Sequence, residues 1–156
     1  MTSVNDMLDQ AAQTEARLET QLGTIRDASP DGGVRLLTYN LRRRCSRLRM
    51  AIEELYPGER ETAALVDFEG KPLANPGATE PLEEAQPESV TSLQLLEAAV
   101  EHSHAMSALY ADLLQHDLST DLAAALQALR EREQKDAGML QRMIDAKYPE
   151  LPTKQS

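Results

Sequence analysis

The sequence predicts an all-α protein built from two pairs of helices, and three observations support this fold class. Aromatic residues make up only 3% of the 156 residues, whereas leucine, alanine, glutamate and arginine, which favour helices, are plentiful. Apolar residues recur at helical spacing in four long segments. A segment rich in proline, glycine and glutamate separates the first two segments from the last two. The length favours a single domain over residues 1–156 with one core.

The first helical hairpin is expected over residues 3–56. Its helices are predicted over 4–25 and 33–55, because apolar residues line one face of each segment. Ser3, followed three residues later by an aspartate, is a capping signal at the start of the first helix. The stretch "DASPDGG" predicts a turn between the helices, and the proline and glycine at 57–58 end the second one.

The second hairpin is expected over residues 89–148, after a long crossover at 57–88. Its helices are predicted over 89–115 and 121–147, with "HDLSTD" as the turn. The apolar pattern of this half repeats that of the first half at a shift of about 90 residues. An up-down bundle does not need about 30 linking residues. The sequence therefore predicts a four-helix bundle with one crossover, the ferritin-like arrangement.

Charge and composition narrow the class of partner. The formal net charge of -10 and the pI near 4.7 argue against nucleic acid and anionic membranes as partners, because the field of the protein repels phosphate. The only cysteine, Cys45, cannot form a disulfide within the chain. The N-terminal "MTSVNDMLDQAAQTE" has no signal-peptide features, and no apolar run approaches 18 residues. These features predict a cytoplasmic protein.

Five polar residues are predicted to point into the bundle. At about 100° per residue, each polar side chain can be placed relative to the apolar stripe of its helix. Glu15 lies within the stripe of the first helix, and Arg44 lies at the edge of the stripe of the second. Ser103 is near the middle of the third stripe, and Glu133 and Asp136 project with the fourth. The sequence predicts that these five form a polar cluster in the core.

Other polar residues are assigned to the surface or to structural roles. Glu101 and His104 have the spacing of a Glu-x-x-His metal motif, but they fall on the outer face of the third helix. His102 lies at the edge of its stripe, where a hydrogen-bonded structural histidine is expected rather than a metal ligand. The remaining arginines of "LRRRCSRLR" are expected to be solvated and to pair with neighbouring acids: Arg42, Arg43, Arg47 and Arg49.

Two stretches carry a family resemblance. "LLEAAVEHSHAMSALYADLL" and "LAAALQALREREQKDAGMLQRMI" resemble the second hairpin of rubrerythrin-like proteins of the ferritin family, and the first hairpin resembles its counterpart more weakly. The resemblance implies a ferritin-like bundle. It also implies a two-metal centre, usually of iron, held by a glutamate on the first and third helices and a Glu-x-x-His motif on the second and fourth.

The residues at the family's ligand positions only partly match this pattern. Glu15 matches the ligand of the first helix, and Glu133 matches the glutamate of the fourth. The other four positions depart from it: Leu41 and Arg44 replace the glutamate and histidine of the second helix, Ser103 replaces the glutamate of the third, and Asp136 replaces the histidine of the fourth. The resemblance therefore implies a degenerate site.

The chemistry of these replacements predicts a bundle without metal or other cofactor. Leu41 offers no donor atom, and Arg44 brings a fixed positive charge that repels cations. A guanidinium can instead bridge two carboxylates in the core. We therefore expect Arg44 to be the counter-charge of Glu133 and Asp136, unless these acids simply reach a wet end of the bundle.

The expected function is that of a metal-free ferritin-like protein that acts by binding or assembly, with no catalytic residues. The alternative is a metal-binding protein, an oxidoreductase or a metal store, that holds iron or manganese with Glu15, Glu133 and Asp136. Binding of a small molecule in the core is a third possibility. A homodimer is expected because spare apolar residues lie away from the centre of the stripes: Leu93, Leu109 and Leu114.

Overall fold

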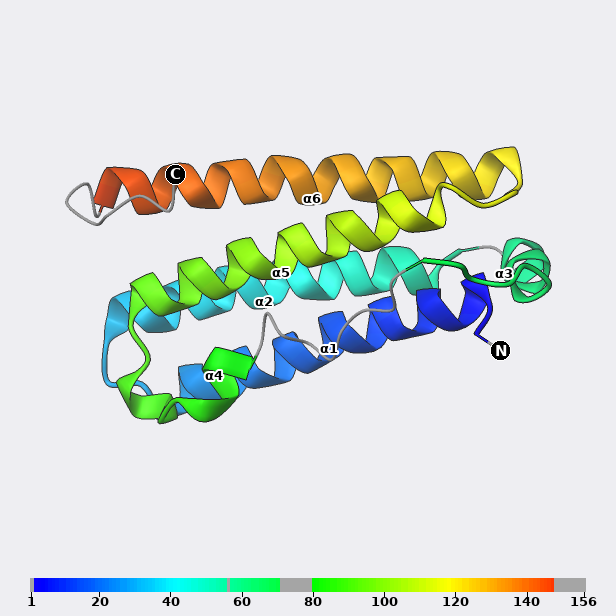
Figure 1. Cartoon of the computed structure of the whole chain (residues 1–156). Helices are drawn as coiled ribbons and strands as arrows, with labels where there is room; N and C mark the ends of the chain where they lie inside the picture. The colour runs from blue at the N-terminus through cyan, green and yellow to red at the C-terminus, as the bar shows by residue number, and fades with distance from the viewer. Residues whose placement is uncertain (1, 56, 71–79, 148–156) are drawn as a thin grey trace.

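Four long α-helices make up most of the computed structural model, which describes residues 2–55, 57–70 and 80–147 (Figure 1). The long helices are α1 (Val4–Ala28), α2 (Gly32–Glu53), α5 (Ser92–Leu113) and α6 (Thr120–Lys147). The connection between the two pairs contains α3 (Pro57–Ala64), α4 (Glu80–Glu84) and a 3-10 turn, η1 (Pro87–Ser89). The described residues contain no β-strand, apart from an isolated bridge between Ser3 and Asp67.

The long helices pack as two antiparallel pairs, α1 with α2 and α5 with α6. Figure 1 shows that α5 runs in the same direction as α2, while α3 lies near the start of α1 and α4 lies toward the other end of the bundle. The predicted all-α fold and its two helical pairs are therefore confirmed. None of the described helices is both long enough and apolar enough to span a membrane.

The helix ends follow local capping signals. Ser3 and Asp6 form the predicted capping box at α1, with the Asp6 amide 3.0 Å from the Ser3 hydroxyl. The predicted start of the third helix at 89 is wrong: α5 begins after Thr91, which forms a capping box with Gln94. Pro87 starts a 3-10 turn just before it, because proline suits a first helical position but cannot continue a helix.

The connection is bound to the first hairpin at both of its described parts. The amide of Val4 donates to the carbonyl of Val66 over 2.8 Å, and the amide of Phe68 donates to the carbonyl of Thr2 over 2.9 Å. Leu82 of α4 is buried in the core. Residues 71–79 of the predicted crossover, and residue 148 at the end of the predicted second hairpin, lie outside the described residues.

The apolar core consists of two clusters along the bundle. One includes Leu18 and Leu22 of α1, and the other includes Met7 and Leu8 nearer the start of the same helix. Glu15, which is completely buried, lies between these two sets along α1. The two apolar clusters thus leave room for polar side chains between them.

Candidate functional site

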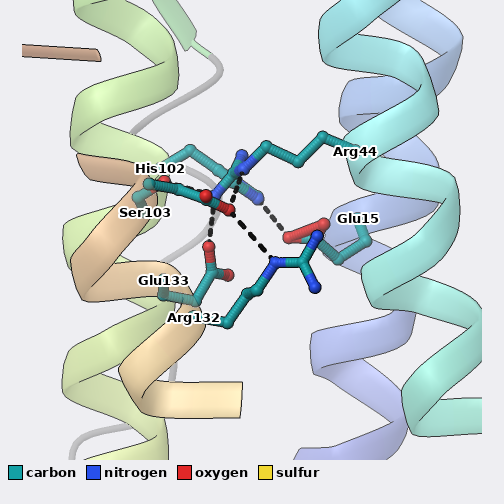
Figure 2. A network of polar contacts seen from close by, with 7 residues as sticks. Glu15, Arg44, His102, Ser103, Arg132 and Glu133 are labelled. Carbon is teal, nitrogen blue, oxygen red and sulfur yellow. Dashed lines mark hydrogen bonds and ion pairs between the residues drawn. The ribbon is translucent and has the colours of Figure 1, made fainter. Parts of the chain in front are cut away.

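A buried set of polar side chains from all four long helices lies in the middle of the bundle (Figure 2). We call it the core cluster, and each member is at most 9% exposed: Glu15, Arg44, His102, Ser103, Glu133 and Asp136. The five residues predicted from the sequence are all buried here, and His102 joins them. Because no member is more exposed than that, the cluster is closed to a substrate in this conformation.

Arg44 is the centre of one half of the cluster. Its Nε donates to Oδ2 of Asp136 over 2.6 Å, and its Nη2 donates to Oγ of Ser103 over the same distance. The same Nη2 also forms an ion pair with Oε1 of Glu133. One guanidinium therefore holds two carboxylates and a hydroxyl, as expected from its fork of donors. Arg132 approaches the same oxygen of Asp136 at 3.9 Å from the solvent side.

Glu15 and His102 form the other half of the cluster. Nε2 of His102 contacts Oε1 of Glu15, and the two side chains are 1% and 0% exposed. His102 is therefore hydrogen-bonded, as expected, but it lies in the core cluster rather than outside it. His102 faces α1 across the bundle. The apolar stripe of one helix does not show which side chain of another helix a residue contacts.

The electrostatics of the cluster follow from its burial. Desolvation, reinforced by repulsion from Glu15, raises the pKa of Glu133 to about 8, although Arg44 opposes the shift. Burial by itself would lower the pKa of Arg44, but Glu133 and Asp136 outweigh it, so the pKa of Arg44 is raised. At neutral pH a protonated Glu133 leaves Asp136 as the carboxylate that balances the charge of Arg44.

Three donors of the cluster could in principle hold a cation. Within the described residues, Glu15, His102 and Glu133 each offer a ligand atom, and these atoms lie within 4.8 Å of one another. Their other polar atoms are buried and have no hydrogen-bond partner among the described residues: Glu15 Oε2, His102 Nδ1 and Glu133 Oε2. The alternative metal set predicted from the sequence contained Asp136 instead of His102. In the structure Arg44 binds Asp136, and His102 lies close to the two glutamates.

The same geometry shows what opposes a two-metal centre. Leu41, which the resemblance would place at a ligand position, is 5% exposed and belongs to the apolar core. Arg44 occupies the space beside Glu133 and carries a permanent positive charge. The three donors therefore suit a single cation better than a pair of cations.

The remaining polar residues lie outside the cluster. Glu101 and His104 are exposed on the outer face of α5, as predicted. Arg49 pairs with Glu19 and Glu53, over 3.3 and 2.6 Å. The expectation that the other arginines pair with acids is wrong for the described part of the chain, since these form no ion pair there: Arg42, Arg43 and Arg47.

The fold and the cluster define a class: a helical bundle with a buried arginine–carboxylate network and a neighbouring Glu/His/Glu group. Comparison with protein families, with curated proteins and with solved structures finds no match to the chain.

Proposed function

We propose that this chain is a metal-free bundle of ferritin-like arrangement that acts by binding, as an assembly or partner protein. One observation carries the proposal: the guanidinium of Arg44 holds both Glu133 and Asp136 in the interior. In this proposal the arginine–carboxylate network stands where ferritin-like proteins hold two metal ions. It serves the stability of the bundle rather than a reaction.

The order and direction of the helices support the ferritin-like arrangement. Two antiparallel pairs are joined by a long connection, and α5 runs in the same direction as α2 (Figure 1). Consecutive antiparallel neighbours would give the opposite direction. A connection that passes from one end of the bundle to the other is what such a topology requires, and α3 and α4 lie toward opposite ends.

Access and charge support a non-enzymatic role without metal. Glu15 and Glu133 are completely buried, so a substrate cannot reach them unless the helices separate. The guanidinium of Arg44 already supplies a positive charge, and a second cation beside it would be repelled. Replacement of two family ligands by Leu41 and Ser103 removes donors that a two-metal centre needs.

Metal analysis tests this proposal. We expect protein purified without a histidine tag, and then incubated with ferrous or manganous ions and desalted, to retain far less than one metal ion per chain. The reason is that Arg44 engages the carboxylates that would bind the ions. Elemental analysis is the measurement. Two ions per chain, or the visible absorption of an oxo-bridged iron pair, would overturn the proposal.

A second candidate is a site for a single cation, favoured by the three donors of Glu15, His102 and Glu133. Imidazole and carboxylate ligands suit several divalent transition metals. The same analysis separates the two candidates. Retention of one ion per chain in the wild type, and its loss in His102→Leu, would support the single-cation site. The metal-free proposal expects no difference between these two proteins.

Self-association is part of the proposed role, and we expect a homodimer. The three leucines that led to this expectation have little surface available for an interface. Leu109 is buried, and Leu93 and Leu114 pack against the apolar clusters. A dimer must therefore use other side chains. Light scattering over a wide concentration range measures the mass, and a monomer mass at the highest concentration would contradict the prediction.

A further inference from the structure

The charge of α2 is opposite to that of the chain as a whole. The chain has a net charge of -10, but α2 contains six arginines and one acidic residue, Glu53. Two of the arginines, Arg44 and Arg49, are engaged by carboxylates. The others have no carboxylate partner within the described residues: Arg35, Arg42, Arg43 and Arg47. The helix therefore presents uncompensated positive charge on an acidic protein.

A groove lies between this helix and α6. Its volume is about 320 Å³, and its lining includes Leu48 and Ala51 of α2 together with Ala125 and Ala128 of α6. Two arginines, Arg47 and Arg132, also line it, one from each helix. Arg47 is exposed, and the side chain of Arg132 is 51% exposed. We call this feature the α2/α6 groove: it is apolar inside and positively charged beside its walls.

Further along the same two helices, three large apolar side chains are exposed. Leu36 lies about three turns before Arg47 on α2, and Met139 and Met143 lie about two and three turns after Arg132 on α6. Their exposed fractions are 64%, 46% and 39%, respectively. Because α2 and α6 run in opposite directions (Figure 1), these exposed apolar residues lie beyond the same end of the groove.

We infer that the α2/α6 groove binds an acidic amphipathic helix of another protein, an inference that rests on the proposed binding role and specifies the partner. A groove between two helices accepts the apolar face of a third helix, with anchors spaced at three and four residues. Carboxylates beside those anchors would meet Arg47, which has no ion pair within the described residues, and Arg132, whose nearest described carboxylate oxygen is 3.9 Å away on Asp136. Such charge complementarity selects the partner and speeds its association.

Other occupants fit the groove less well. A second copy related by a two-fold axis through the groove would bring its own Arg47 and Arg132 against the same residues, because such an interface pairs identical patches. Like charges placed together in this way are unfavourable. The net charge of -10 would repel nucleic acid and anionic membranes, and the apolar lining of the groove makes no favourable contact with their phosphates.

A synthetic peptide tests the inference. The probe is a fluorescently labelled peptide with leucines along one helical face and glutamates on both sides of them, and fluorescence anisotropy reports its binding to the full chain. A peptide of the same composition in scrambled order and a peptide with lysines in place of the glutamates are the controls. We expect saturable binding of the acidic helix alone, weaker at high salt because exposed charges are screened.

Matched variants locate the binding surface. We expect Arg47→Glu to weaken peptide binding about tenfold or more, since it replaces attraction by repulsion. Ala51→Glu should act in the same direction by placing a carboxylate in the groove. Arg35→Glu makes the same charge change about 120° around α2 from Arg47, and it should alter binding by less than about twofold. Circular dichroism would verify that each variant is folded.

Several results would overturn the inference: no binding of the acidic peptide, equal binding of the lysine peptide, or equal losses in Arg47→Glu and Arg35→Glu. A dimer that Arg47→Glu abolishes would identify a second copy as the occupant. Binding of heparin or anionic vesicles in place of the peptide would identify a polyanion. If the protein holds no metal but does not bind the peptide, only the inference about the groove is wrong. If the protein binds the peptide but holds two metal ions per chain, only the metal-free proposal is wrong.

Discussion

The variant Arg44→Leu is expected to lose about 3 to 5 kcal/mol of unfolding free energy, the usual cost of removing one partner of a buried ion pair. The change leaves Asp136 and Glu133 in the interior without their guanidinium. The control is Arg47→Leu on the same helix. Arg47 is exposed and has no ion pair within the described residues, so its loss should stay within about 0.5 kcal/mol. Urea midpoints measure both effects.

Two further measurements separate an unpaired charge from a mere loss of packing. Arg44→Leu should recover part of its stability relative to the wild type at low pH, because a protonated carboxyl no longer needs a cation. Replacing Arg44, Glu133 and Asp136 together by apolar residues should be far milder than Arg44→Leu alone. Equal and small losses in Arg44→Leu and Arg47→Leu would show that the network contributes nothing to stability.

The pH dependence of stability is expected to carry a large contribution from Glu133. Its pKa in the folded protein is raised to about 8, whereas an unperturbed glutamate has a pKa of about 4.3. Between these values the unfolded chain releases the proton and the folded chain keeps it. The contribution is therefore fully present below about pH 4.3 and falls by about 1.4 kcal/mol per pH unit as the pH rises toward 8. Above about pH 8 it no longer changes.

The variant Glu133→Gln isolates this contribution, because glutamine keeps the shape of the side chain and does not titrate. Its unfolding free energy, measured by urea denaturation at a series of pH values from 5 to about 9, should fall less steeply with pH than that of the wild type. The difference between the two proteins should amount to several kcal/mol across this range. Parallel pH profiles would show that Glu133 has an ordinary pKa and is charged beside Arg44 at neutral pH.

The helices and most of the core cluster could be predicted because helical periodicity places each residue on a face of its own helix. Glu15, Ser103 and Glu133 lie among apolar neighbours at helical spacing, and all three are completely buried. Arg44 was expected at the edge of its stripe, and its long side chain reaches inward to acids on α6. Because unpaired charges in the interior are costly, acids and a guanidinium on inward faces are expected to pair.

Features that depend on how two helices face each other could not be predicted in this way. The contact between His102 and Glu15 depends on the rotation of α5 relative to α1, which a single helix does not reveal. Leu109 lay away from the centre of its predicted stripe, but the buried face of α5 is wide and includes Leu109. The predicted start of the third helix at residue 89 differs from the observed start at Ser92, because Thr91 and Gln94 form the capping box of α5 and Ser89 belongs to the preceding 3-10 turn.

The buried polar contacts join the two halves of the chain: Arg44 of the first hairpin binds Asp136 of the second, and His102 of the second contacts Glu15 of the first. Leucine faces tolerate a sliding movement of one hairpin along the other, since one apolar contact replaces another. A shift by one helical turn, about 5.4 Å, would break these polar contacts and leave charges buried without partners. The cluster therefore sets the register between the hairpins, so that one alignment of four leucine-rich helices is strongly favoured over its neighbours.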